Sequence, residues 1–342
     1  MTQEYTAHSV TDGGEDHRSG SRVRTLLDRW RGDPGIWRRG IVLALLAVVV
    51  ALLMISHAQI PNKIGNLGSL IETFLPWFGV FVPLILVLAL VRRSATALIA
   101  VVLPAVVWVN LFGGLLTDKS GGGGDLMVAT HNVNADNPDP AGTARKLAES
   151  GADVVALEEL KASAVETYVE ALAGTYKYHS VQGTVGLWSK YPMTGTEPVD
   201  IRLGWVRAMR ATVTTPEGGR VAVYVAHLPS VRVKLNAGFT ANQRDKSADA
   251  LGEAIADESL SRVILLGDLN GTMNDRSLNA VTSQMRSTQG AAGHGYGFSW
   301  PTSFPLARID QIMVKGVEPT SSWTLPETDS DHLPIAARVE LS

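Results

Sequence analysis

Three long apolar runs fill most of the first third of the chain, and they restrict its possible folds more than any other feature. They cover residues 41–58, 70–91 and 95–116. About 20 apolar residues in a helix cross a bilayer, and three such runs in succession are rare in soluble domains. Pro76, Pro83 and Pro104 fall within the second and third runs, and spanning helices tolerate proline. We therefore predict three transmembrane helices within residues 41–116.

The basic residues predict how these helices are oriented. Arginines concentrate before the first run and recur at Arg92 and Arg93, whereas the loop between the first and second runs holds only Lys63. Basic flanks stay in the cytoplasm. Residues 1–40 are therefore expected to form a cytoplasmic, basic tail with a disordered start, and everything after the third run is expected to lie outside. The chain is thus expected to be a multi-pass plasma-membrane protein, with Glu72 as an interfacial carboxylate near the outer end of the second run.

A glycine run separates the apolar part from the rest of the chain. Residues 117–124 include four consecutive glycines from Gly121 to Gly124, and such a linker is flexible. Residues 125–342 then have a suitable length for one α/β domain. The net charge of −3 gives no electrostatic argument for a nucleic-acid-binding protein. The absence of cysteine excludes disulfides and thiolate metal sites.

Strand-like segments outnumber helical ones in this outer domain. Strands are expected over residues 126–134, 153–159, 185–189, 206–214, 220–227, 262–266, 308–314 and 334–341. Helices are expected over residues 143–150, 164–173 and 243–258. Many strands and few helices favour two packed sheets that are covered by helices.

Polar residues gather where these apolar strands end. They are Asn132, Glu159, His227, Asp268, Asn270, Asp310 and the pair Asp331 and His332. In an extended segment residues two apart point to the same side, so Asp268 and Asn270 are expected to face one site. Each position alone also fits a polar turn that satisfies local backbone groups. Polar residues at six strand ends are hard to explain as independent turns.

The residue types suit phosphoryl chemistry. Oxygen ligands such as Asn132 and Glu159 fit a hard cation such as Mg²⁺. Histidines can donate to phosphate oxygens, and a carboxylate such as Asp268 can orient and deprotonate water. The sequence lacks both cysteine and a His-x-x-x-His spacing, which argues against a zinc site of the thiolate or zincin kind.

Seven segments together resemble the endonuclease/exonuclease/phosphatase family, which includes DNase I, abasic endonucleases and sphingomyelinases. The matching segments are residues 130–134, 157–159, 186–192, 226–228, 267–270, 308–310 and 330–334. They occur in the order of the family and span nearly the whole outer domain. The resemblance implies a DNase I-like four-layer α/β sandwich, in which two packed β-sheets are flanked by helices, preceded here by the three transmembrane helices.

The resemblance also implies a role for each residue. Metal ligands would be Glu159, Asn132 and Asp331, binding Mg²⁺ or Mn²⁺. Catalytic residues would be Asp268 on the attacking water with Asn270 beside it, His332 on the phosphate with Asp310 orienting its ring, and His227 as a second phosphate-facing histidine. Glu158 is the neighbouring alternative to Glu159. The basic residues of the domain have two possible roles, contact with phosphates or a solvated basic face. The second is expected for most of Arg202, Arg207, Arg210, Arg232, Lys234 and Arg244.

The substrate class follows less directly. Three spans followed by such a domain resemble the actinobacterial membrane proteins of the VanJ type, which are associated with teicoplanin resistance. This resemblance implies a phosphorylated lipid in the bilayer as substrate, such as undecaprenyl pyrophosphate, hydrolysed at the outer face of the membrane. The alternatives are a membrane-anchored nuclease that faces outward, a sphingomyelinase or phospholipase C-like phosphodiesterase, and an inactive binding module.

Overall fold

The computed structural model describes residues 35–62, 65–234 and 238–341 of the chain. The expected tail lies outside these ranges up to residue 34, and so does Lys63. The chain divides into two compact units. The first comprises Met1–Ala51 and Gly79–Ala105, and the second comprises Leu52–Phe78 and Val106–Ser342.

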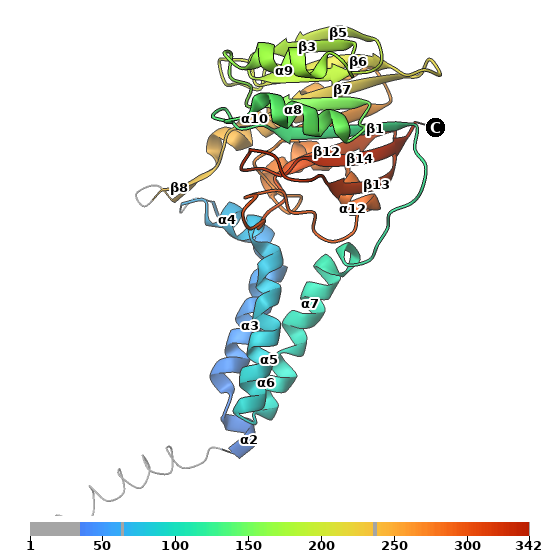
Figure 1. Cartoon of the computed structure of the whole chain (residues 1–342). Helices are drawn as coiled ribbons and strands as arrows, with labels where there is room; N and C mark the ends of the chain where they lie inside the picture. Colours follow the sequence, from blue (N-terminus) through green and yellow to red (C-terminus); the bar gives the residue numbers. More distant parts are fainter. Residues whose placement is uncertain (1–34, 63–64, 235–237, 342) are drawn as a thin grey trace, which may run out of the picture. The chain divides into compact units, whose positions relative to one another are not determined.

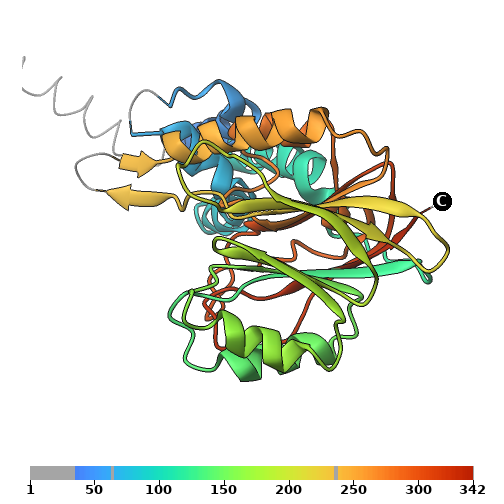
Figure 2. The same ribbon diagram turned by 90° about the horizontal axis from the view of Figure 1, so that it is seen from above.

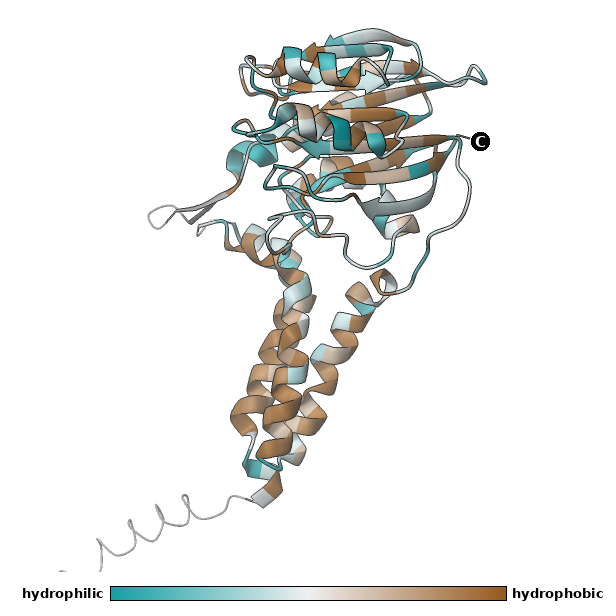
Figure 3. Cartoon of the chain, in the orientation of Figure 1, coloured by the Kyte–Doolittle hydropathy of each residue, from teal (hydrophilic) through white to brown (hydrophobic). Residues whose placement is uncertain are grey.

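The apolar runs form helices. These are α2 (Gly35–Arg38), α3 (Ile41–Ile55), α5 (Phe81–Val91), α6 (Ala95–Ala100) and α7 (Val102–Phe112). Gly35–Ile55 and Ala95–Leu115 are long and apolar enough to cross a membrane. The pair Leu67–Thr73 and Leu75–Val91 passes the same test but is bent by 67°. Figure 3 shows that the apolar colour dominates α3, α5 and α7, and Val42 and Val91 are exposed by 79% and 74%. The described residues therefore contain two candidate spans, or three if the bent pair is one span.

The segment between α3 and α5 is short and irregular. It contains the 3-10 helix η1 (His57–Gln59), the helix α4 (Leu67–Thr73) and the 3-10 helix η2 (Leu75–Val80). A further 3-10 helix, η3 (Gly113–Leu115), follows α7. Residues up to Phe78 in this segment belong to the same compact unit as the outer domain.

Two six-stranded sheets form the centre of the outer domain (Figure 1). The first has the order β13-β14-β1-β2-β4-β3 and the second β11-β12-β10-β7-β6-β5. Strands of the first sheet are β1 (Leu126–Asn132), β2 (Val154–Glu158), β3 (Tyr178–Gln182), β4 (Val185–Ser189), β13 (Glu318–Thr324) and β14 (Ile335–Glu340). Strands of the second are β5 (Met193–Pro198), β6 (Ala208–Thr214), β7 (Arg220–Ala226), β10 (Val263–Asp268), β11 (Arg286–Ser287) and β12 (Asp310–Lys315). A separate hairpin pairs β8 (Arg232–Lys234) with β9 (Gly238–Thr240).

The side chains that point inward from alternate positions of the strands form the core between the sheets. Val128 of β1 and Ile264 of β10 belong to one buried cluster, together with Val223 of β7. Their neighbours in sequence, such as Met127 and Val263, belong to clusters on the outer faces. Successive side chains of a strand point to opposite faces, so each central strand is apolar on both sides and needs a cover on each.

Helices supply that cover. Over the first sheet lie α8 (Pro140–Glu149) and α9 (Val165–Leu172), with Leu147 and Leu172 in the outer cluster. Over the second lie α10 (Asn242–Ala256) and α11 (Asn279–Thr282), with Leu251 and Val281 in theirs. The remaining short helices are η4 (Arg276–Leu278) and α12 (Thr288–Ala292). Figure 2 shows the green helices on one side of the strands and the orange α10 on the other, which is the expected four-layer sandwich.

Differences from the expected elements lie at edges and ends. The predicted helix over residues 143–150 begins at Pro140, because the side chain of Asp139 caps it by accepting the N–H of Gly142 at 2.8 Å. The four edge strands of the two sheets, β3, β5, β11 and β13, were not expected. All six residues of β5 are exposed or half-buried, so this edge strand lacks the apolar run that identifies a central strand.

Candidate active site

The first sheet brings two of the expected residues to one edge. β1 ends at Asn132 and β2 ends at Glu158, and these two residues are register partners in a parallel pair. Glu159 follows directly, with a positive φ of 61°. That turn separates the two glutamates. Glu158 is buried and accepts the Thr130 hydroxyl at 2.7 Å, and burial raises its pKa well above 4.5. The side chain of Glu159 is 33% exposed.

The second sheet places two carboxylates opposite one another. Asp268 at the end of β10 and Asp310 at the start of β12 are register partners in an antiparallel pair. Gly267 precedes Asp268 with φ 143°, and a Cβ at Gly267 would lie 2.0 Å from the carbonyl oxygen of Ala226. Glycine is therefore needed where β10 passes close to the end of β7. His227 follows β7 immediately, so both strand ends contribute to one place.

Hydrogen bonds fix the Asp268 carboxylate from three directions. Its Oδ1 accepts the Asn270 N–H at 2.8 Å. Its Oδ2 accepts the side-chain amides of Asn270 at 3.0 Å and Asn132 at 3.1 Å. Burial, with the nearby Asp310 charge, raises the pKa of Asp268 to about 7. A buried carboxylate that titrates near neutral pH is suited to take a proton from water.

His332 forms a close pair with Asp310. The Nδ1 of His332 lies 2.9 Å from Asp310 Oδ2 and 3.1 Å from Oδ1, and both side chains are buried. Burial disfavours the imidazolium, but the Asp310 charge and hydrogen bond outweigh it and raise the pKa of His332 to about 10. The Nε2 of His332 lies 4.0 Å from Asp268 Oδ2. The ring is therefore a cation whose free N–H can donate to an anion beside Asp268.

His227 connects the two sheets. Its Nε2 lies 3.4 Å from Glu159 Oε1 and 3.6 Å from Asp268 Oδ2, and it is also in close contact with Arg207 Nη2. Burial, then the charges of Arg207 and His332, lower the pKa of His227 well below 6.5. This histidine is therefore neutral near pH 7.

One cavity of about 400 Å³ collects these side chains, and its size is typical of a ligand site. Its polar lining residues are Glu159, Ser230, Asp268, Asn270, Asp331 and His332. Its other lining residues are Thr73, Phe74, Val231, Trp300, Ala307 and Ile309. All eight residues expected at the site either line this cavity or contact a residue that does, since Asn132, His227 and Asp310 each contact Asp268 or His332.

The donor atoms fit a divalent cation. The cavity holds the carboxylates of Glu159 and Asp331 next to Asp268, and carboxylate oxygens are the ligands that Mg²⁺ prefers. Asp331 accepts the Asn134 side-chain amide at 3.0 Å. Asp268, Asp310 and His332 also present ligand atoms within 4.8 Å of one another. Because Asp310 and His332 already bond to each other, the more open side with Glu159 and Asp331 is the better cation site.

Sequence reasoning missed several residues near the site. Arg207 contacts His227 and lies under the Trp205 ring, 5.0 Å from its centroid. The fully buried side chain of Arg244 donates to the Asn270 carbonyl at 2.8 Å. For both, the sequence allows contact with phosphates but favours a solvated face, and the sequence around them carries no signal that separates them from exposed arginines. Thr73 and Phe74 precede the outer domain by some fifty residues (125 − 74 = 51), so no domain-based pattern could include them.

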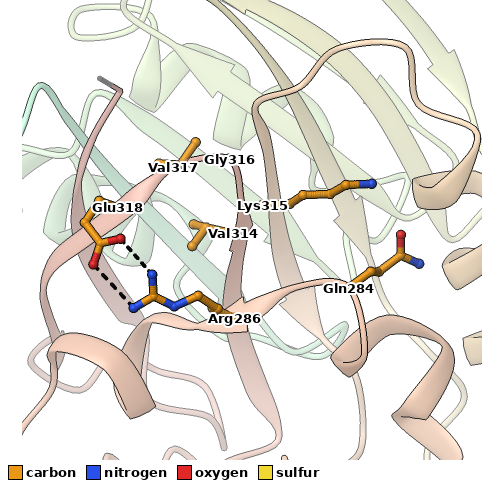
Figure 4. A pocket seen from close by; sticks show the side chains of 7 residues that line it. All are labelled: Gln284, Arg286, Val314, Lys315, Gly316, Val317 and Glu318. Carbon is orange, nitrogen blue, oxygen red and sulfur yellow. Dashed lines mark hydrogen bonds and ion pairs between the residues drawn. The ribbon is translucent and has the colours of Figure 1, made fainter.

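A second concave surface lies at the other end of β12 (Figure 4). It measures about 340 Å³ and is lined by Gln284, Arg286, Val314, Lys315, Gly316, Val317 and Glu318. Its arginine and glutamate pair with each other at 2.7 Å, and both are more than half exposed. Their charges are thus already matched, and the cavity with Asp268 is the candidate site.

Comparison with known proteins agrees with this geometry. The model of the family described as "Endonuclease/Exonuclease/phosphatase family" matches residues 129–332, which run from β1 to His332. No curated protein matches the chain significantly.

Solved structures share the fold of the outer domain. A mannosyl-6-phosphatase from Bacteroides thetaiotaomicron is 17% identical with a TM-score of 0.51, over 63% of this chain and 99% of that one. D. rerio TDP2 complexed with single-strand DNA product is 20% identical with a TM-score of 0.53, over 63% and 98%. A beta toxin from Staphylococcus aureus is 16% identical with a TM-score of 0.51, over 62% and 99%. At these identities the likeness concerns the fold alone.

Proposed function

We propose that this chain, which belongs to the endonuclease/exonuclease/phosphatase family, hydrolyses a phosphate ester or anhydride carried by a membrane lipid. The family comprises phosphoester hydrolases that depend on a divalent metal. One observation carries the hydrolase assignment: Glu159, Asp268, Asn270, Asp331 and His332 line a single cavity. The lipid assignment rests on the apolar helices of the same chain, two or three of which have the length and composition of membrane spans.

The protein's own groups divide the reaction between them. The ionised Asp268, held by Asn132 and Asn270, takes the proton of the attacking water. The cationic His332, oriented by Asp310, donates its Nε2–H to a phosphoryl oxygen and stabilises the charge that develops there. A divalent cation held by Glu159, Asn132 and Asp331 adds charge stabilisation at the phosphoryl oxygens when bound.

The location follows from the charge pattern of the sequence. The catalytic domain lies on the outer side of the plasma membrane and the basic N-terminal segment in the cytoplasm, because arginines flank the first helix and recur at Arg92 and Arg93. A lipid-linked pyrophosphate exposed at that face, such as undecaprenyl pyrophosphate, is the substrate we favour. Its removal would connect the protein to glycopeptide resistance of the teicoplanin kind.

A nuclease is the second candidate, and one feature favours it. Trp205 is 55% exposed and lies over Arg207 beside His227, and an exposed aromatic ring beside an arginine can stack on an unpaired base. The D. rerio TDP2 structure with single-strand DNA has the same fold.

The products that purified full-length protein forms in detergent with Mg²⁺ test the proposal. They are inorganic phosphate from a C15 isoprenyl pyrophosphate, phosphocholine from sphingomyelin, and shortened strands from single-stranded DNA. We expect release from the pyrophosphate, and loss of at least about a hundredfold in kcat for Glu159→Gln. The matched control is Glu166→Gln on the exposed face of α9, which should retain full activity. Cleavage of DNA alone would establish the second candidate instead.

A further inference from the structure

A buried ion pair joins the segment between α3 and α5 to the catalytic domain. The side chain of Glu72 in α4 is fully buried, and its Oε1 lies 2.8 Å from Nε of Arg276 in η4. The backbone N–H of Arg276 donates to the other carboxylate oxygen at 3.3 Å. Burying a carboxylate is costly unless a cation pairs with it. Without Arg276 the Glu72 carboxylate would be buried without a cation, so this pair helps to fix the position of α4 on the domain.

Arg276 also holds the start of the same segment. Its Nη1 donates to the Ala58 carbonyl at 2.6 Å, and its Nη2 donates to the His57 carbonyl at 3.0 Å. A Cβ at Gly68 would lie 2.3 Å from Nη2, so glycine leaves room for the guanidinium to reach these carbonyls. One side chain of the domain thus binds two parts of the segment.

Trp77 fixes the other end. Its indole N–H donates to the Leu306 carbonyl at 2.8 Å. Its ring stacks on Phe298, with centroids 5.9 Å apart and planes at 21°. The segment is therefore attached to the domain at His57, at Glu72 and at Trp77, and Thr73 and Phe74 are held between the last two of these contacts.

Thr73 and Phe74 line the catalytic cavity itself. They share that cavity with Asp268 and His332, and the apolar part of its lining includes Trp300 and Ile309. Within the described residues, the cavity thus combines a charged side with an uncharged, largely apolar one. A ligand that fills both is amphiphilic, because apolar atoms gain by leaving water while a phosphate stays beside the charged groups.

Phe74 also lies only a few residues before an apolar helix in the sequence. It precedes Phe81, the first residue of α5, by seven residues (81 − 74), which span at most about 25 Å when fully extended. We propose that Phe74 and the apolar residues opposite it bind the hydrocarbon chain next to the phosphate of a lipid substrate. This inference rests on the proposed function and names a specificity-determining residue for it.

Two substrates with the same reacting group and different tails test the inference. They are methyl pyrophosphate and a C15 isoprenyl pyrophosphate, assayed with the full-length protein in detergent. We expect the parental protein to prefer the C15 substrate in kcat/KM. In Phe74→Ala, kcat/KM for C15 should fall about tenfold through a higher KM, since roughly one to two buried methylene equivalents are lost. The value for methyl pyrophosphate, which has no hydrocarbon chain to contact Phe74, should stay within about twofold.

A matched control and a second variant complete the test. Tyr178→Ala removes an exposed aromatic ring from the edge strand β3 and should leave both substrates unchanged. Arg276→Met releases the segment and should lower the C15 preference as Phe74→Ala does. If Phe74→Ala does not fold, Phe74→Leu should show a smaller loss in the same direction.

The outcomes separate the two proposals. Release of phosphate from neither substrate by the parental protein refutes the proposed function, and this inference with it. Cleavage of both substrates with equal kcat/KM overturns the inference and leaves the hydrolase function standing. An unchanged C15 preference in Phe74→Ala also overturns the inference and leaves the hydrolase function standing.

Discussion

The buried Arg244, which contacts the backbone at Asn270, gives the sharpest stability prediction. Arg244 and Asp275 are both fully buried and lie 2.6 Å apart. Arg244 also donates to the Asn270 carbonyl at 2.8 Å and to the Ser277 hydroxyl at 2.7 Å. Replacing Arg244 by methionine leaves the Asp275 carboxylate buried without its cation. Breaking a buried pair in this way costs about 3–5 kcal/mol.

The expected change in melting temperature follows from the size of the domain. Residues 125–342 make 218 residues (342 − 125 + 1), and for that size 1 kcal/mol shifts Tm by roughly 2–4 °C. A loss of about 4 kcal/mol therefore lowers Tm by roughly 8–16 °C. Thermal unfolding of the purified full-length protein, followed by tryptophan fluorescence, measures this shift.

A double-mutant cycle tests the cause. Asp275→Asn should also destabilise, but Arg244→Met combined with Asp275→Asn should lose at least about 2 kcal/mol less than the sum of the two. The control is Arg286→Met, which breaks an ion pair whose partners are more than half exposed and should cost less than about 1 kcal/mol. Additive effects at Arg244 and Asp275, or a Tm shift no larger than that of Arg286→Met, would refute the reasoning.

Three further predictions concern pH, metal and topology. Burial raises the pKa of Glu258, but hydrogen bonds from Arg210, the Leu260 N–H and the Tyr224 hydroxyl outweigh it and lower the pKa from 4.5 to about 2. The stabilisation that ionised Glu258 contributes is therefore present above about pH 4.5 and is lost as the pH falls towards 2. Glu258→Gln should therefore lower stability by about 2 kcal/mol at neutral pH, and the difference from the parental protein in thermal unfolding should shrink below about pH 4.5, whereas a constant difference would contradict this origin. Chelation by EDTA should abolish phosphate release and added Mg²⁺ or Mn²⁺ should restore it; activity that persists in EDTA would exclude the cation site proposed at Glu159. An alkaline phosphatase reporter at the C-terminus should be active in intact cells, because that enzyme matures only after export, and an inactive but expressed fusion would reverse the orientation.

The central strands of the fold could be predicted from the sequence, and the edges could not. β10 and β7 are buried on both faces, so they appear in the sequence as continuous apolar runs. The edge strand β5 has no buried residue, and its backbone pairing with β6 leaves no hydrophobic pattern. Four of the candidate site residues could be placed for the same reason as the central strands, because Asn132 and Asp268 end such a run and Glu159 and His227 follow one directly.

The sequence could not predict the environment of charged residues whose partners are distant in the chain. Glu72 was expected to be an interfacial carboxylate, but it is buried against Arg276, 204 positions later in the chain (276 − 72). Arg244 was expected on a solvated face, but its side chain is fully buried beside Asp275. The sequence does not distinguish a buried charged side chain from an exposed one. Only the tertiary structure determines whether the charge contacts water or a partner.

The register of one strand pair explains why two similar aspartates have different roles. β10 and β12 place Asp268 directly opposite Asp310, and two neighbouring buried carboxylates cannot both ionise without cost. His332 resolves the conflict, because its ring lies 2.9 Å from Asp310 but 4.0 Å from Asp268. Burial disfavours the charged form of Asp310, but the His332 imidazolium outweighs it and lowers the pKa of Asp310. The pKa of Asp268, in contrast, is raised to about 7. A shift of β12 by one residue would move Asp310 to the other face of the sheet and remove both effects. The proposed division into an orienting and a proton-accepting carboxylate therefore depends on strand pairing.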